Sequence, residues 1–100
     1  MNVYFEVGDY KFEWDKEKYE LNKKKHDVSF ELAAEVFLDD FKIDDYDELH
    51  SDYEDRNKVI GMVEKVLVVI YTERGERYRI ISARLANKKE VNQYYEQFRY

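Results

Sequence analysis

The side chains best suited to chemistry are four arginines that follow the most apolar stretch of the chain. Residues 66–72 are β-branched or aromatic without a strand breaker, so they are predicted to form a strand buried on both faces. Residues 78–84 are predicted to return antiparallel to it after a turn at Gly75, which can adopt a positive φ angle. Cations fixed on rigid strands are suited to binding phosphate oxygens. These cations are Arg74, Arg77, Arg79 and Arg84.

The arginines also have a simpler interpretation, as solubilising side chains that pair with glutamates near the turn. This interpretation is as good as the functional one for Arg74 and Arg77, which flank the turn, and weaker for Arg79 and Arg84. Side-chain alternation along a strand places Arg79 and Arg84 on opposite faces unless a β-bulge intervenes. We therefore expect one of them to serve a site and the other to serve structure or partner binding.

Four strands and three helices are expected to position these arginines, with a short N-terminal hairpin at residues 3–14. The strands are predicted at 41–48, 56–63, 66–72 and 78–84, with the acidic first one at an edge. Each helix follows a residue whose side chain can accept its first free amides. The expected caps are Asp15 for a helix at 16–25, Ser29 for one at 30–38, and Asn87 for the last helix.

The last helix has two further signals. Glu90 stands three residues after Asn87, as in a capping box. An apolar stripe at helical spacing should pack on the sheet; it consists of Val91, Tyr94, Tyr95 and Phe98. The element order predicts an α+β fold in a single domain over residues 1–100, with a four-stranded, mostly antiparallel sheet, two N-terminal helices and one C-terminal helix.

Composition excludes several classes of protein. The chain has no cysteine, which excludes a disulfide framework and a cysteine zinc site. It has no apolar run of membrane-spanning length and no signal peptide, so we expect a cytoplasmic protein without a membrane partner. The net charge is −6, but segment 39–55 holds nine acidic residues and one lysine, so the remainder carries +2. One sign of electrostatic field can therefore be concentrated at a site.

Several motifs occur in one order along residues 11–95. They are Phe12-Glu13-Trp14-Asp15, Lys18, Asn22, Lys25-His26, Val28-Ser29-Phe30-Glu31, Ala33, Val36-Phe37, His50-Ser51, Glu54, Arg56, Gly61, Val68-Val69, Tyr71-Thr72, Arg74, Arg79-Ile80-Ile81-Ser82-Ala83-Arg84, Ala86 and Glu90, with Tyr94 or Tyr95 after them. In this order they resemble the BrnT family, the ribonuclease toxins of a type II toxin–antitoxin pair.

The resemblance implies a RelE-like fold and an endoribonuclease that cleaves RNA and arrests translation. It also implies neutralisation by a BrnA-type antitoxin, a ribbon-helix-helix dimer, in a heterotetramer that contacts operator DNA only through the antitoxin. In RelE-like enzymes, basic residues and a tyrosine near the end of the sheet and the last helix act on RNA. By resemblance, this favours Arg84, Lys88 and Tyr95.

RNA cleavage without a metal or cofactor needs a base, an acid and cations that stabilise the transition state. His26 and His50 are the acid–base candidates, since histidine titrates near neutral pH. Glu54 or Glu90 can serve if its pKa is raised. The other catalytic candidates are Arg56, Arg79, Arg84 and Tyr95. The substrate-binding candidates are Lys25, Tyr71 and Lys88.

Structural roles compete with these assignments. His26 can close a helix, His50 can fix a turn, and Glu90 can act as a capping residue. At least one of Tyr94 and Tyr95 should be buried in the core.

Two rival functions also remain open. The first is a non-catalytic module that binds its antitoxin in operon autorepression, which the acidic charge favours. The second is a metal-dependent nuclease in which His50 and Glu54 hold a divalent ion. A solvated acidic edge, or a surface that meets a basic antitoxin segment, explains segment 39–55 more simply than a metal site.

Overall fold

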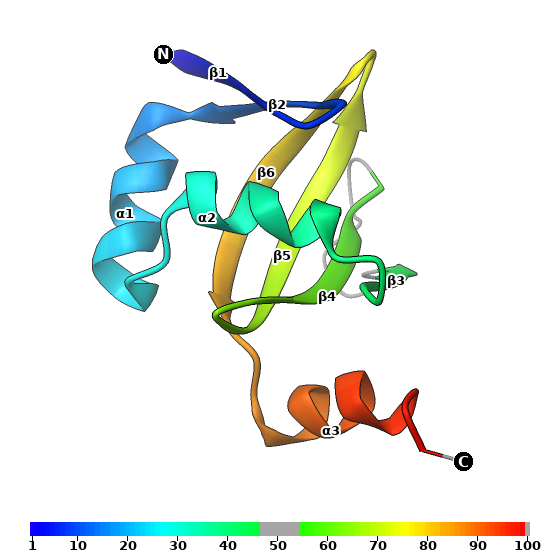
Figure 1. The fold of residues 1–100 in the computed structure, drawn as a ribbon. Coiled ribbons are helices and arrows are strands. Elements are labelled where there is room, and N and C mark those ends of the chain that lie inside the picture. The colour runs from blue at the N-terminus through cyan, green and yellow to red at the C-terminus, as the bar shows by residue number, and fades with distance from the viewer. Residues whose placement is uncertain (47–54, 100) are drawn as a thin grey trace.

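The computed structural model describes residues 1–46 and 55–99. The predicted α+β class is confirmed, with three α-helices and one six-stranded sheet in these ranges (Figure 1). No described helix is long and apolar enough to cross a membrane. In chain order the elements are β1 (Asn2–Val7), β2 (Tyr10–Asp15), α1 (Lys16–His26), α2 (Phe30–Glu35), the 3₁₀ turn η1 (Val36–Leu38), β3 (Ile43–Tyr46), β4 (Asn57–Val63), β5 (Lys65–Arg74), β6 (Arg77–Leu85) and α3 (Lys88–Glu96).

The sheet has the strand order β1-β2-β6-β5-β4-β3. The prediction of four strands beside a separate hairpin is wrong, because β2 pairs in parallel with β6 through Phe12–Tyr78 and Glu13–Arg79. This pairing joins the hairpin to the sheet, and the remaining pairs are antiparallel. The acidic strand β3 lies at an edge, as predicted.

The three predicted helix caps are confirmed. The side chain of Asp15 accepts a hydrogen bond from the Lys18 amide at 3.1 Å, and that of Ser29 accepts one from the Leu32 amide at 3.0 Å. Asn87 caps α3 in the predicted capping box. The helix predicted at 30–38 is shorter than expected, because its last turn tightens into η1.

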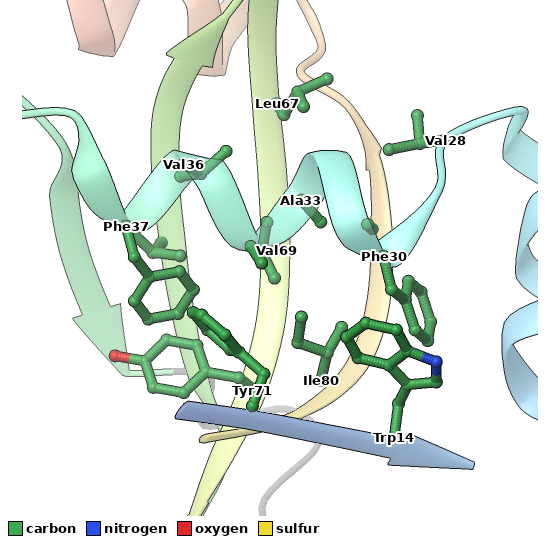
Figure 2. Close-up of a cluster of buried hydrophobic side chains, with 14 residues drawn as sticks. Trp14, Val28, Phe30, Ala33, Val36, Phe37, Leu67, Val69, Tyr71 and Ile80 are labelled. Atoms are coloured by element: carbon green, nitrogen blue, oxygen red, sulfur yellow. The ribbon is translucent and has the colours of Figure 1, made fainter. Parts of the chain in front are cut away.

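Helices α1 and α2 lie across one face of the sheet and enclose the main core (Figures 1 and 2). Trp14 and Phe30 are fully buried and meet edge-to-face with ring centroids 5.7 Å apart. Phe37 packs in the same way on Tyr71 at 5.0 Å. Aromatic pairs of this kind add to the hydrophobic stabilisation that their buried area provides. We call the helix-covered side of the sheet the inner face, and the other side the outer face.

Helix α3 packs at one end of the outer face. Tyr94 is 4% exposed among Ile60, Val66 and Val68 of β4 and β5. The predicted apolar stripe is only partly buried, because Tyr95 and Phe98 remain 48% and 39% exposed. The prediction that at least one of the two tyrosines enters the core is confirmed by Tyr94.

A bulge interrupts the pairing of β5 with β6. Ile70 pairs with Ser82, but the next residue, Tyr71, pairs with Ile80. Ile81 is therefore an extra residue on β6, and side-chain alternation is reset at this point. Ile80 and Ala83 consequently both enter the core beneath the helices, although they are three positions apart and regular alternation would place them on opposite faces.

The bulge changes the faces of the two most informative arginines. Arg79 is opposite Thr72, and Arg84 is opposite Val68. Cross-strand partners share a face, and Thr72 and Val68 are an even number of residues apart. Both arginines therefore lie on the outer face, and the prediction of opposite faces is wrong because a bulge lies between them.

Candidate functional site

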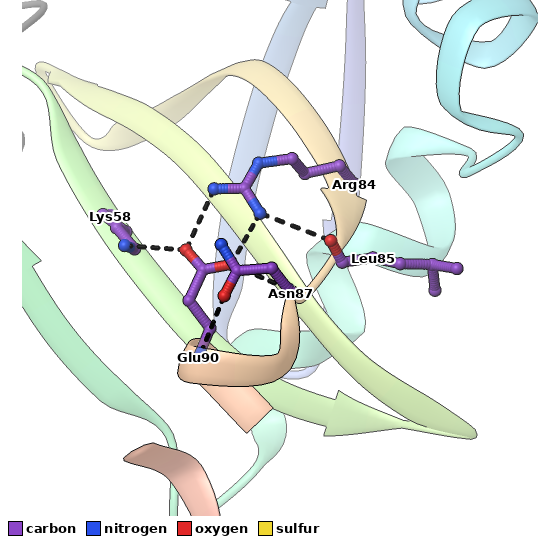
Figure 3. Close-up of polar contacts among 5 residues, drawn as sticks. All are labelled: Lys58, Arg84, Leu85, Asn87 and Glu90. Atoms are coloured by element: carbon purple, nitrogen blue, oxygen red, sulfur yellow. Dashed lines mark hydrogen bonds and ion pairs between the residues drawn. The ribbon is translucent and has the colours of Figure 1, made fainter. Parts of the chain in front are cut away.

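A three-residue charged cluster lies on the outer face beside the start of α3 (Figure 3). The Glu90 carboxylate accepts two hydrogen bonds from the Arg84 guanidinium, Nη1 to Oε1 at 2.7 Å and Nη2 to Oε2 at 2.9 Å. The Lys58 ammonium lies 2.8 Å from Oε2 of the same carboxylate. This two-point contact fixes the plane of the guanidinium, and the cluster carries one excess positive charge.

The backbone around α3 holds the cluster in place. Glu90 Oε1 accepts the Asn87 amide at 2.9 Å, and Asn87 Oδ1 accepts the Glu90 amide at 2.9 Å. The hydrogen bonds from Arg84 outweigh burial and, with those from Lys58 and Asn87, lower the pKa of Glu90 from 4.5 to about 2. The possibility that Glu90 is a base with a raised pKa is therefore wrong.

A second ion pair lies on the same face where β2 meets β6. Arg79 Nη1 lies 2.6 Å from Glu13 Oε2 and donates to Asn2 Oδ1 at 3.2 Å. Next to it, Arg77 donates to the Phe12 carbonyl at 3.0 Å. The Arg77 guanidinium also lies 4.8 Å from the centroid of the Tyr4 ring, a cation–π contact.

These contacts give the outer face a local positive charge. Among the residues of these contacts, four cations stand against two carboxylates, an excess of +2 on a chain with net charge −6, while Asp45 of β3 lies on the same face opposite Lys58. The cations are Lys58, Arg77, Arg79 and Arg84, and the carboxylates are Glu13 and Glu90. Arg79 and Arg84 keep 15% and 35% of their side-chain surface exposed, so an anion can approach them. We call these six residues the outer-face cluster.

The structure places the remaining candidates at three other positions. His26 ends α1 and lines a cavity beside the β4–β5 turn, and Lys25 is exposed next to it. Lys88 and Tyr95 are exposed on α3, at its first residue and in its last turn. Arg56 is half-buried immediately before β4. His50 lies outside the described residues.

Tyr71 is part of the core on the inner face. It is 8% exposed, and its hydroxyl donates to Asp44 Oδ1 at 3.2 Å. Burial, with the nearby Asp44 charge, raises the pKa of Tyr71. Its ring is enclosed by Phe37 and Tyr78, so the structure does not bring it together with Arg79 and Arg84.

Two structurally important polar residues were given no role from the sequence, although Asn22 belongs to the series of motifs along residues 11–95. Asn22 is buried, and its side chain donates to the Ala83 carbonyl at 2.8 Å and accepts from the Ala83 amide at 3.3 Å. Asp39 accepts from the Tyr94 hydroxyl at 2.6 Å and from the Met62 amide at 2.8 Å. The signals available for Asn22 were its place in the motif series and its uncharged amide within a strongly charged helix.

Lys58 was also missed, because strand alternation alone does not indicate which face will receive α3. Among the described residues, no three His, Cys, Asp or Glu side chains gather as metal ligands. Glu54 and His50, the pair considered for a divalent ion, are outside those residues.

The fold and the outer-face cluster define a small α+β protein with a cationic sheet surface suited to a polyanion. The family model described as the ribonuclease toxin BrnT of type II toxin–antitoxin systems matches residues 14–90, and the chain belongs to this family. The chain is also similar to the Brucella abortus ribonuclease toxin BrnT, solved as a crystal structure, with a TM-score of 0.57 and 26% identity. That match covers 75% of this chain and 94% of the Brucella chain. No curated protein sequence matches the chain.

Proposed function

We propose that this chain is a toxin that cleaves RNA internally, without a metal, and thereby arrests translation in the cytoplasm. The observation that carries the proposal is the excess of +2 within the outer-face cluster of a chain whose net charge is −6. Since RNA is repelled by an acidic surface, a positive area on such a chain is a specific place for a phosphate.

Within the outer-face cluster, Arg84 and Lys58 are placed so that they could bind one phosphate together. Arg84 uses Nη1 and Nη2 to bind Glu90, but a guanidinium has five N–H donors in a fixed plane. Lys58 is held beside it as a point charge. Together they would bind the phosphate and stabilise the charge that develops during cleavage. Arg79 would hold a phosphate further along the same RNA, because its partner Thr72 lies four residues, roughly 13 Å, from the partner of Arg84 on β5.

Acid–base roles remain with the histidines. His26 lines a cavity that Leu85 also lines, and Leu85 directly follows Arg84. In this proposal, the ribose of the cleaved nucleotide extends from a phosphate at Arg84 around the end of β6 toward His26. Arg56, Lys25, Lys88 and Tyr95 would extend the contact with RNA. His50 is kept as the partner acid or base on its residue type alone.

RNA cleavage by the purified, antitoxin-free protein in excess EDTA tests this proposal. Arg84→Lys keeps the charge but loses the planar fork, and we expect it to lower the cleavage rate at least about tenfold. Arg99→Ala is the matched control, because Arg99 forms an exposed pair with Glu96 on the far end of α3. Cleavage that requires added magnesium, or an Arg84→Lys rate equal to wild type, would contradict the proposal.

One observation favours the rival, a non-catalytic module that binds an antitoxin. Arg79 and Arg84 are already paired with carboxylates, so each must exchange or share a partner before it binds phosphate. Expression without antitoxin separates the two functions. Growth arrest that Arg84→Lys relieves supports the ribonuclease, whereas normal growth with wild type supports the module.

The proposed partner is a BrnA-type antitoxin, a ribbon-helix-helix dimer that holds two toxin chains and contacts operator DNA. Support comes from the type II toxin–antitoxin family to which the chain belongs. Co-expression followed by mass measurement of the purified complex tests the stoichiometry. A mass that fits two toxin and two antitoxin chains is the expected result.

A further inference from the structure

A cavity of about 200 Å³ lies where the end of α1 meets the turn between β4 and β5. Its apolar lining comes from Val28, Leu32, Val63, Leu67 and Leu85. Its polar lining comes from His26, Asp27, Glu64 and Lys65. We call it the end cavity. Its volume is below the roughly 300–1,000 Å³ of sites for drug-sized ligands, so it suits one planar ring system.

Two residues that line the end cavity have a left-handed backbone conformation. Asp27 and Glu64 have φ angles of 57° and 62°, and both line the end cavity. In the described part of the chain, they are the non-glycine residues with positive φ. Asp27 closes α1, a common position for this conformation. Glu64 forms the tight turn between β4 and β5, where Val63 pairs with Lys65, so the turn accounts for its positive φ angle and fixes its backbone beside the end cavity.

The polar lining has a distinct hydrogen-bonding character. Asp27 and Glu64 bring carboxylates, which act only as acceptors when ionised. An unstacked RNA base is recognised through the hydrogen-bonding groups on its edges and through its flat faces. Guanine presents two adjacent N–H donors, on N1 and N2, which match the two oxygens of one carboxylate. The half-buried His26 ring and the apolar side chains provide flat and apolar contact surfaces.

The end cavity borders the end of β6, the strand that carries Arg84. Leu85 lines the cavity, and its carbonyl accepts a hydrogen bond from Arg84 at 3.3 Å. A nucleotide whose phosphate is bound at Arg84 could therefore extend its base around the end of β6. Lys65, at the mouth of the cavity, adds a cation near the connecting backbone.

From these observations we propose that the end cavity binds one unstacked RNA base, with guanine preferred, and that the Glu64 carboxylate selects it. The inference rests on the proposed function, since it assigns the base preference of the same RNA site.

Binding of single nucleotides tests the inference independently of cleavage. The protein labelled with ¹⁵N is titrated with each of the four nucleoside 3′-monophosphates and, separately, with inorganic phosphate. We expect guanosine 3′-monophosphate to shift the amide signals of Glu64, Lys65 and Leu85, with at least about tenfold higher affinity than the other three nucleotides. Inorganic phosphate, which would bind at Arg84 next to Leu85, should leave the Glu64 signal in place.

Glu64→Asn is the decisive variant, because asparagine tolerates positive φ but lacks the carboxylate. It should lose the preference for guanosine monophosphate, and Glu64→Gly should do the same without backbone strain. Glu76→Asn is the matched control, an exposed glutamate at the β5–β6 turn. If both Glu64 variants keep the preference, or no nucleotide shifts the three signals, the inference is wrong.

RNA cleavage distinguishes failure of the inference from failure of the proposed function. Selective nucleotide binding without any RNA cleavage would support the end cavity as a base site and contradict the ribonuclease proposal. Cleavage with unchanged base preference in Glu64→Asn would contradict the end cavity and leave the ribonuclease in place. Variants that cleave normally but escape neutralisation by the antitoxin would assign the cavity to the antitoxin and also overturn the inference.

Discussion

Glu90 is the residue on which both the charged cluster and the last helix depend. Its carboxylate binds Arg84 and Lys58 and also accepts the Asn87 amide that begins α3. Only 5% of its side-chain surface is exposed, so water cannot replace most of the hydrogen bonds that these partners make with the carboxylate. Removal of its charge therefore leaves two cations close together and a helix end without its carboxylate acceptor.

Glu90→Gln tests this dependence. We expect the free energy of unfolding to fall by about 1–3 kcal/mol, which is less than the roughly 3–5 kcal/mol for breaking a fully buried pair, because Arg84 is partly exposed. Urea denaturation at pH 7 measures the change. Glu96→Gln is the control, because that carboxylate pairs with Arg99 at the surface. Equal effects of the two variants would show that the cluster does not stabilise the fold.

The same variant has a pH dependence of known sign. The pKa of Glu90 falls from 4.5 to about 2 on folding, so its stabilisation is fully present above about pH 4.5. It is lost as the pH falls from there toward 2. We therefore expect the difference in unfolding free energy between wild type and Glu90→Gln to be constant from pH 7 to 5 and to shrink below pH 4.5. A difference that grows on acidification would contradict the assignment.

At the scale of single residues, the sequence predicted local hydrogen bonds well, but it did not predict on which face of the sheet a side chain lies. The caps Asp15, Ser29 and Asn87 were predictable because donor and acceptor lie three residues apart. The common face of Arg79 and Arg84 was not, because it depends on where β6 is bulged against β5. A one-residue irregularity reverses every later assignment along a strand.

Strand β6 is paired on one side along its whole length and on the other side only near its start. β5 pairs with it from Arg77 to Leu85, but β2 pairs with it only at Tyr78 and Arg79. Beyond this point, the side chain of Asn22 on α1 bonds both the carbonyl and the amide of Ala83. An amide side chain therefore takes the place of a neighbouring strand, and it ties α1 to the strand that carries Arg84.

Asn22→Ala and Asn22→Asp test this link between helix and strand. Alanine leaves the buried Ala83 amide and carbonyl without their partner, and aspartate sets a carboxylate against the carbonyl. We expect losses of about 1–3 kcal/mol in unfolding free energy for alanine and at least as much for aspartate. Hydrogen exchange at the Ala83 amide should accelerate more than the global change explains. Asn92→Ala, at an exposed position on α3, is the control; an equal effect there would contradict the prediction.

At the scale of elements, periodicity predicted which segments are helices and strands, but not how the hairpin joins the sheet. The strands β4, β5 and β6 follow one another through short turns, and such antiparallel neighbours are expected from sequence. The parallel pairing of β2 with β6 brings together Glu13 and Arg79, which are 66 residues apart. No local signal specifies such a pair, and the Arg79–Glu13 contact follows from it.

The molecule as a whole combines a positive outer face with a net charge of −6. Its principal extents are 45 × 29 × 28 Å. At 0.01 M salt the Debye length is about 30 Å, so an RNA strand at the outer face also senses acidic residues on the other side of the molecule. At 0.15 M it falls to about 8 Å, and the RNA senses mainly the outer-face cluster. Varying the salt concentration therefore distinguishes the effect of the outer-face cluster from that of the acidic residues elsewhere on the molecule.

The opposite signs of the outer-face cluster and of the whole chain predict an unusual salt dependence of RNA binding. Neutralisation of about three phosphates by Lys58, Arg79 and Arg84 would give a slope of roughly −2 in log affinity against log salt for a single strand. We expect that slope between about 0.1 and 0.3 M, and a much flatter dependence below about 0.03 M, where repulsion by the acidic surface opposes binding. Fluorescence anisotropy with a short, uncleavable RNA analogue measures both ranges.

The double variant Glu35→Gln, Asp40→Asn isolates the long-range repulsion, because both carboxylates are exposed, one at the end of α2 and one in the turn after η1, and lie outside the outer-face cluster. This variant should bind RNA more tightly at low salt and leave binding at 0.3 M unchanged. Below about 0.03 M, its slope of log affinity against log salt should come close to the slope between about 0.1 and 0.3 M. Arg84→Lys should keep the slope and lower affinity at every salt concentration, because it preserves charge and removes directed hydrogen bonds. A wild-type slope that stays near −2 down to the lowest salt would mean that the net charge does not reach the site, and that the cluster alone determines how this acidic protein meets RNA.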